Sequence, residues 1–142
     1  MLNEEIDLPA VLAEVKAQFE RYEKALVSND VAVLDEMFWT DPRVQRFGVG
    51  ENLYGIDAIR RFRQSRSPSG LDRVLDQTQI HTFGTDFAVA NTEFYRADKS
   101  LCGRQSQTWV KLPQGWRVVS AHVSIISLPR DVNLGQGGSS VW

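Results

Sequence analysis

The sequence is poor in the residues on which disulfide, redox and metal chemistry depend. Its 142 residues include one cysteine, Cys102, and two histidines, His81 and His122. One cysteine cannot form an internal disulfide, and the histidines belong to no cluster with metal-ligand spacing. We therefore expect no metal and no other cofactor, and the low cysteine content favours the reducing cytoplasm. Cys102 is interpreted as a small apolar residue at the start of a strand.

Long apolar runs and a strong net charge are missing as well. No apolar run approaches the ~20 residues of a membrane-spanning helix, and no signal-peptide pattern opens the chain. The formal net charge is −2, which argues against non-specific binding to nucleic acid. The sixteen basic residues comprise twelve arginines and four lysines. The planar fork of arginine suits carboxylates better than the lysine ammonium does, although solvated surface arginines are the commoner use. We expect a small anionic partner, and neither a membrane nor a nucleic acid.

Three helices are predicted in the first half of the chain. The first carries an apolar stripe at spacings of four, three and four residues: Val15, Phe19, Tyr22 and Leu26. Asp7 is expected to cap this helix, and Pro9 suits its first turn. A second helix is predicted over 31–38, and a third over 56–66. The inner face of the third helix contains Ile56, Ile59, Phe62 and Arg63.

Six strands are predicted around and after the third helix, over 44–49, 51–54, 72–83, 86–96, 104–112 and 116–127. The last two form a hairpin, and their length requires a strongly curved sheet with something packed inside the curve. The expected fold class is α+β, with three helices packed in a curved antiparallel sheet. Residues 1–130 would form one cone-shaped domain, followed by a glycine- and serine-rich tail over 131–142.

The alternation of side chains along the strands predicts which of them line the cone. In the last strand we assign one set to the core: Val119, Ala121, Val123 and Ile125. The opposite set is assigned to the outer face or a subunit interface: Trp116, Val118, Ser120, His122 and Ser124. Two further sets are expected inside the cone: Phe87, Val89, Asn91 and Glu93, and beside them Gln105, Gln107 and Trp109. A slip of one residue would reverse any of these assignments.

Two arginines are candidates for binding an anion inside the cone. Arg46 alternates in phase with Val44 and Gly48, and Arg63 follows the inner face of the third helix. A buried arginine without an acidic partner is costly, and a bound carboxylate would satisfy it by a bidentate contact. For most of the other arginines nearby, a solvated helix face is the better interpretation.

Tyr22 is the candidate for proton transfer, because a phenol on a buried stripe needs a polar partner. A positive charge such as Arg46 would lower the pKa of Tyr22, which could then act as a general acid or base or stabilise an oxyanion. A tyrosine that merely hydrogen-bonds to the backbone remains the alternative. Trp39 is expected to form one side of the substrate pocket. Asn91 and Gln107 carry amides that suit a urea-like substrate, although both could be ordinary core polar residues.

The order of elements resembles the nuclear transport factor 2-like superfamily and its SnoaL-like branch. Three segments, RFGVGENLYG (46–55), GRQSQTWV (103–110) and GWRVVSAHVS (115–124), are similar to the AtzH-like family. That family is associated with amidases of oxalurate and cyanuric acid breakdown. The resemblance implies a metal-independent amidohydrolase acting on a carboxylated urea, with conversion of 1,3-dicarboxyurea to allophanate and release of ammonia.

Other functions fit the same residues. An apolar cone with one anion anchor would serve a non-catalytic accessory subunit or ligand carrier of a partner amidase. An isomerase or dehydratase would need a carboxylate or histidine base, for which only Glu93 is suitably placed. In each case the outer face of the long sheet is expected to pair with a second copy, giving a homodimer or a larger homo-oligomer.

Overall fold

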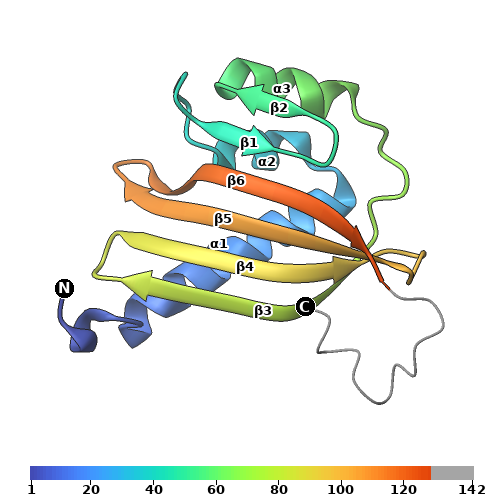
Figure 1. Cartoon of the computed structure of the whole chain (residues 1–142). Helices are drawn as coiled ribbons and strands as arrows, with labels where there is room; N and C mark the ends of the chain where they lie inside the picture. Colours follow the sequence, from blue (N-terminus) through green and yellow to red (C-terminus); the bar gives the residue numbers. More distant parts are fainter. Residues whose placement is uncertain (129–142) are drawn as a thin grey trace, which may run out of the picture.

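Three helices and a curved six-stranded sheet make up the computed structural model, which describes residues 1–128 (Figure 1). The helices are α1 (Pro9–Ser28), α2 (Val31–Met37) and α3 (Ile56–Ser65), after a short 3-10 turn at Asn3–Glu5. The strands are β1 (Gln45–Phe47), β2 (Asn52–Tyr54), β3 (Val74–Phe83), β4 (Phe87–Tyr95), β5 (Leu101–Leu112) and β6 (Gly115–Ser127). The predicted tail, 131–142, lies outside the described residues. No helix within residues 1–128 is long and apolar enough to cross a membrane.

The sheet has the strand order β2-β1-β6-β5-β4-β3, and α1 crosses behind its long strands in Figure 1. The predicted α+β class is confirmed, but the sheet is mixed and not wholly antiparallel. The exception is β1, which pairs in parallel with β6 and antiparallel with β2. The first strand in the chain, β1, follows α2 and lies next to the last strand, β6, in the sheet. This pairing brings α3 to the β1–β2 end of the molecule (Figure 1).

The predicted stripe of α1 is buried along its length, as its spacing requires: Val15, Phe19, Tyr22 and Leu26. The helix begins at Pro9, but its N-cap is Leu8, so the prediction that Asp7 caps the helix was wrong. Asp7 has a positive φ of 57° and turns its carboxylate toward β3 instead. Its oxygens accept a hydrogen bond from the Thr82 amide and contact His81 Nδ1, each at 2.8 Å.

The phase predicted for β4 was wrong. Its buried side chains are Ala88, Ala90, Thr92 and Phe94, while Phe87 is 43% exposed and Asn91 is exposed. Ala88 and Ala90 belong to the same core cluster as the stripe of α1. Small side chains face the helix here, so hydrophobic size was a poor guide to which face is covered.

A β-bulge explains the mixed outcome on β6. Trp109 pairs with Val118 and Thr108 pairs with Ser120, so Val119 is an extra residue that reverses the alternation. Before the bulge, Trp116 and Val118 are buried in the core, against the prediction. After it, Ala121 is buried as expected and Ser120 and His122 are exposed, but Ile125 is 39% exposed. On β5 the predicted inner set is buried throughout: Gln105, Gln107 and Trp109.

Candidate functional site

The centre of the candidate site is a buried hydrogen bond between α1 and α3. Arg63 Nη2 lies 3.0 Å from the Tyr22 hydroxyl, and the two residues are 1% and 4% exposed. A guanidinium can only donate, so the phenol oxygen accepts and its own hydrogen stays available for another acceptor. The Arg63 Cζ also lies 5.2 Å from the centre of the Phe38 ring, within the range of a cation–π contact. The sequence placed both residues on inner helix faces, and the structure brings them together.

The charges around Tyr22 favour its ionised form. Burial by itself raises the pKa of the phenol, but the positive charges of Arg63 and Arg46, with the hydrogen bond from Arg63, outweigh burial and hold the pKa below its usual value. The charge of Arg73 also lowers the pKa of Tyr22, by less than the other causes. The phenol is therefore a stronger acid than an ordinary tyrosine, which suits proton donation.

Arg63 has more donors than partners. Its Nε and Nη1 are buried and find no hydrogen-bond partner within residues 1–128. Buried donors are nearly always satisfied in native proteins, so these two suit a ligand with acceptor oxygens. The carboxylate whose charge interacts with Arg63 is that of Asp35 on α2, where burial raises the pKa more than Arg63 and Arg60 lower it. No sequence pattern had singled out Asp35.

The guanidinium of Arg46 already has an acidic partner in the folded protein. Its side chain is 12% exposed, and its Nη1 donates to Glu51 Oε2 at 2.9 Å across the β1–β2 turn. The expectation of a buried arginine without an acidic partner was therefore wrong for Arg46. Its Cζ packs 5.0 Å from the centre of the Phe62 ring. Arg46 thus contributes positive potential at Tyr22, whereas Arg63 has two buried donors that find no partner within residues 1–128.

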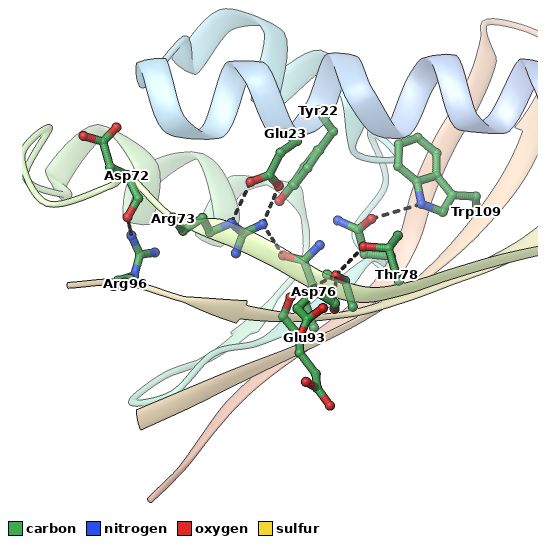
Figure 2. A network of polar contacts seen from close by, with 12 residues as sticks. Tyr22, Glu23, Asp72, Arg73, Asp76, Thr78, Glu93, Arg96 and Trp109 are labelled. Atoms are coloured by element: carbon green, nitrogen blue, oxygen red, sulfur yellow. Dashed lines mark hydrogen bonds and ion pairs between the residues drawn. The ribbon is translucent and has the colours of Figure 1, made fainter. Parts of the chain in front are cut away.

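A second polar network lies next to Tyr22, between α1 and the strands (Figure 2). Arg73 forms a bidentate pair with Glu23, at 2.8 and 2.6 Å, and its Nη2 also donates to Gln105 Oε1 at 2.9 Å. On the other side of Tyr22, Trp109 Nε1 donates to Gln107 Oε1 at 3.1 Å. Sequence reasoning missed the Glu23–Arg73 pair, because fifty residues separate its members and no local pattern links them.

Two side chains that were expected inside the cone lie on the other face of the sheet. Asn91 is exposed on the outer face of the sheet, because β4 has the phase opposite to the one expected. Glu93 shares that face, where burial and the nearby Asp76 raise its pKa. Trp39 is half-buried against the core, with the Arg43 guanidinium 4.8 Å from the centre of its ring. The site therefore contains Tyr22 and Arg63 at its centre. Gln107 is linked to it through Trp109, whose ring contacts Tyr22, and Arg46 acts on Tyr22 through its charge.

No cluster of three or more histidine, cysteine, aspartate or glutamate side chains is placed to hold a metal ion within residues 1–128. The polar groups that converge on Tyr22 are mostly N–H donors, which suit oxygen acceptors and repel cations.

Comparison with known proteins identifies the family of this chain and several similar structures. A model of the AtzH-like family matches residues 4–128. A protein of unknown function from Pectobacterium atrosepticum is 58% identical, with a TM-score of 0.88 over 89% of this chain and 99% of that one. A cystatin-like fold protein from Burkholderia xenovorans is 44% identical, with a TM-score of 0.84 over 88% and 98%. A nuclear transport factor 2-like superfamily protein from Salmonella enterica is 25% identical, with a TM-score of 0.66 over 90% and 97%. No curated protein matches the chain.

Proposed function

Because the chain belongs to the AtzH-like family, we propose that it is an amidohydrolase that cleaves a C–N bond of a small carboxylated urea. The observation that carries the proposal is the buried Tyr22–Arg63 hydrogen bond, beside two Arg63 donors that have no partner among residues 1–128. It places an acidic phenol next to a cation that can hold a carboxylate or a developing oxyanion. Neither group requires a metal or an organic cofactor for this role.

The substrate proposed is 1,3-dicarboxyurea and the product allophanate. The expected release of ammonia does not balance, because both compounds contain two nitrogen atoms. The balanced reaction adds one water to the dicarboxyurea dianion and gives allophanate and bicarbonate, each with one negative charge. The bond that breaks joins a urea nitrogen to a terminal carboxylate carbon, and its electron pair stays with the nitrogen.

Arg63, Arg46 and Tyr22 have different roles in the proposed reaction. Arg63 binds carboxylate oxygens through Nε and Nη1, and Arg46 adds positive potential from the edge of the site. Water adds to the terminal carbon, and the charge that develops on its oxygens is stabilised by Arg63. Tyr22 donates its hydroxyl hydrogen to the departing nitrogen, and the neighbouring arginines stabilise the phenolate that this leaves. A proton released by the attacking water restores the phenol.

The test compares Tyr22→Phe with the wild type and with Tyr54→Phe, a control on β2 whose side chain is exposed. Turnover is followed by allophanate and bicarbonate formation from dicarboxyurea. Affinity is measured by calorimetry with 3-oxoglutarate, which keeps both carboxylates and the central carbonyl but replaces both nitrogens by methylene groups. Loss of general acid catalysis should lower turnover of Tyr22→Phe by ~10²–10⁴-fold, with affinity nearly unchanged. Normal turnover by this variant would remove Tyr22 from the mechanism.

The second candidate is a non-catalytic ligand carrier or accessory subunit of a partner amidase. It is favoured by the two Arg63 donors that lack a partner in the described part of the chain, since a bound anion would satisfy them without any reaction. The same experiment separates the two functions. A wild-type protein that binds 3-oxoglutarate and dicarboxyurea but turns over neither would identify the carrier.

A further inference from the structure

Two glutamines on β5 have an unusual pattern of hydrogen bonds. Gln105 and Gln107 point to the same side of the strand and are 3% and 2% exposed. The carbonyl oxygen of each accepts a hydrogen bond, from Arg73 Nη2 to Gln105 and from Trp109 Nε1 to Gln107. The amide nitrogen of each is buried and has no partner in the part of the chain that the structure describes.

The chemistry of the two neighbours fixes which way each amide points. An arginine guanidinium and an indole N–H can donate hydrogen bonds but cannot accept them. An amide rotated by 180° would place its N–H groups against another donor and lose the bond. Each carbonyl oxygen must therefore face its donor, and each NH₂ group must point the other way.

Each amide is linked to the surroundings of Tyr22 through the residue that donates to it. Trp109, which holds Gln107, packs edge-on against Tyr22 with ring centres 6.4 Å apart. Arg73, which holds Gln105, is anchored by Glu23, the residue after Tyr22 on α1 (Figure 2). The Glu23–Arg73 pair is well buried on the arginine side, where 2% of the side chain is exposed. The Glu23–Arg73 ion pair thus lies next to the Gln105 amide, and the buried indole of Trp109 lies next to the Gln107 amide.

We propose that the amide nitrogens of Gln105 and Gln107 bind acceptor oxygens of the carboxylated urea, and that Arg73 and Trp109 are positioning residues that hold both amides in this orientation. The assignment rests on the proposed function, since it takes the same substrate. With Arg63 it gives the site a lining of fixed N–H donors. Such a lining selects carboxylate and urea oxygens and rejects compounds that present N–H groups at the same points, because donors would then face donors.

The experiment measures the affinity for 3-oxoglutarate of two variants at each glutamine. Gln107→Glu and Gln105→Glu keep an oxygen for the positioning donor and replace only the NH₂ group, while Gln107→Met and Gln105→Met remove the donor without adding charge. Each variant should bind about 10- to 100-fold more weakly, as expected for one lost hydrogen bond to a charged ligand. Gln45→Met and Gln45→Glu, at an exposed position on β1, should bind as the wild type does. Circular dichroism and thermal unfolding confirm that each variant is folded.

A double-mutant cycle tests the positioning role of Arg73. Arg73→Lys keeps the charge but cannot make the fork to Glu23 and the bond to Gln105 together. It should weaken binding, and Arg73→Lys with Gln105→Met should be no weaker than Gln105→Met alone, since Arg73 acts through the amide. Additive losses would give Arg73 a role independent of Gln105 and overturn its assignment.

The outcomes separate this inference from the proposed function. If the methionine variants bind normally and only the glutamate variants fail, charge repulsion explains the loss and the amide assignment is wrong, while wild-type turnover still supports the amidohydrolase. If the wild type neither binds 3-oxoglutarate nor turns over dicarboxyurea, the proposed function fails and the amide assignment fails with it.

Discussion

Replacing Arg63 by methionine should leave the protein as stable as before, or more stable, while it removes ligand binding. Methionine is unbranched and of similar length, so the volume between α1 and α3 stays filled. The structure gives Arg63 one hydrogen bond, to Tyr22, and two buried donors without a partner in residues 1–128. Such a side chain is kept at a cost to folding.

The magnitude follows from the opposing contributions to the free energy of unfolding. Losing the Tyr22 bond costs about 1.5–3 kcal/mol, and losing the contact with Phe38 about 0.5–2 kcal/mol. Removing a buried charge recovers a desolvation penalty of several kcal/mol, and exchanging buried ionic groups for apolar ones is often neutral or stabilising by about 1–4 kcal/mol. We expect a net change between about zero and 2 kcal/mol in favour of the variant. For a chain of this size that is a rise in Tm of up to roughly 8 °C.

The assay is urea unfolding, followed by tryptophan fluorescence, of four proteins: wild type, Arg63→Met, Tyr22→Phe and the double variant. The double variant should be the most stable, because it removes the phenol that Arg63→Met leaves without a partner. Arg61→Met, at an exposed position of the same helix, is the control and should change stability by less than about 0.5 kcal/mol.

One result would refute this reasoning. If Arg63→Met lowers the free energy of unfolding by more than about 3 kcal/mol, Arg63 is a structural counter-ion of the fold. Asp35 is its candidate partner, and the double variant Arg63→Met with Asp35→Asn would then recover the lost stability. Arg63 would no longer be a residue held in place for a ligand.

Three further predictions concern other parts of the molecule. Arg46→Lys should weaken 3-oxoglutarate binding less than Arg63→Lys does, because Glu51 already occupies Arg46 Nη1; calorimetry that gives the reverse order would make Arg46 the main anchor. The hydrogen bonds from His81 and from the Thr82 amide hold the pKa of Asp7 below its usual value, so its contribution to stability is present above about pH 4 and is lost as the pH falls through the lowered pKa. Asp7→Asn should therefore be destabilised at neutral pH and lose part of the wild type's sensitivity to acid, measured as urea midpoints across that range. Light scattering at micromolar concentration should detect a homodimer or a larger assembly, and a strict monomer would contradict the pairing expected of the outer face.

The sequence by itself determined the helices and the side chains that they bury. The stripe of α1, the inner face of α3 and the inner set of β5 follow from periodicities of 3.6 and 2.0 residues, and all of their residues are buried except Phe62 on α3, which is half-buried. The helical period alone therefore places Tyr22 and Arg63 correctly inside the cone. A helix has one apolar stripe, so its pattern leaves little doubt about which face is covered.

Only the tertiary structure decided the strand faces and the ion pairs. On β4 the side chains beneath α1 are small, so the larger residues Phe87 and Val89 pointed to the wrong face and Asn91 was misplaced with them. On β6 the bulge at Val119 reversed the alternation within one strand, which a period of two residues cannot indicate. Ion pairs depend on distances that the fold creates. For that reason the sequence did not show that Arg46 pairs with Glu51 or that Arg73 bonds to both Glu23 and Gln105. Nor did it show that two buried donors of Arg63 lack a partner within residues 1–128.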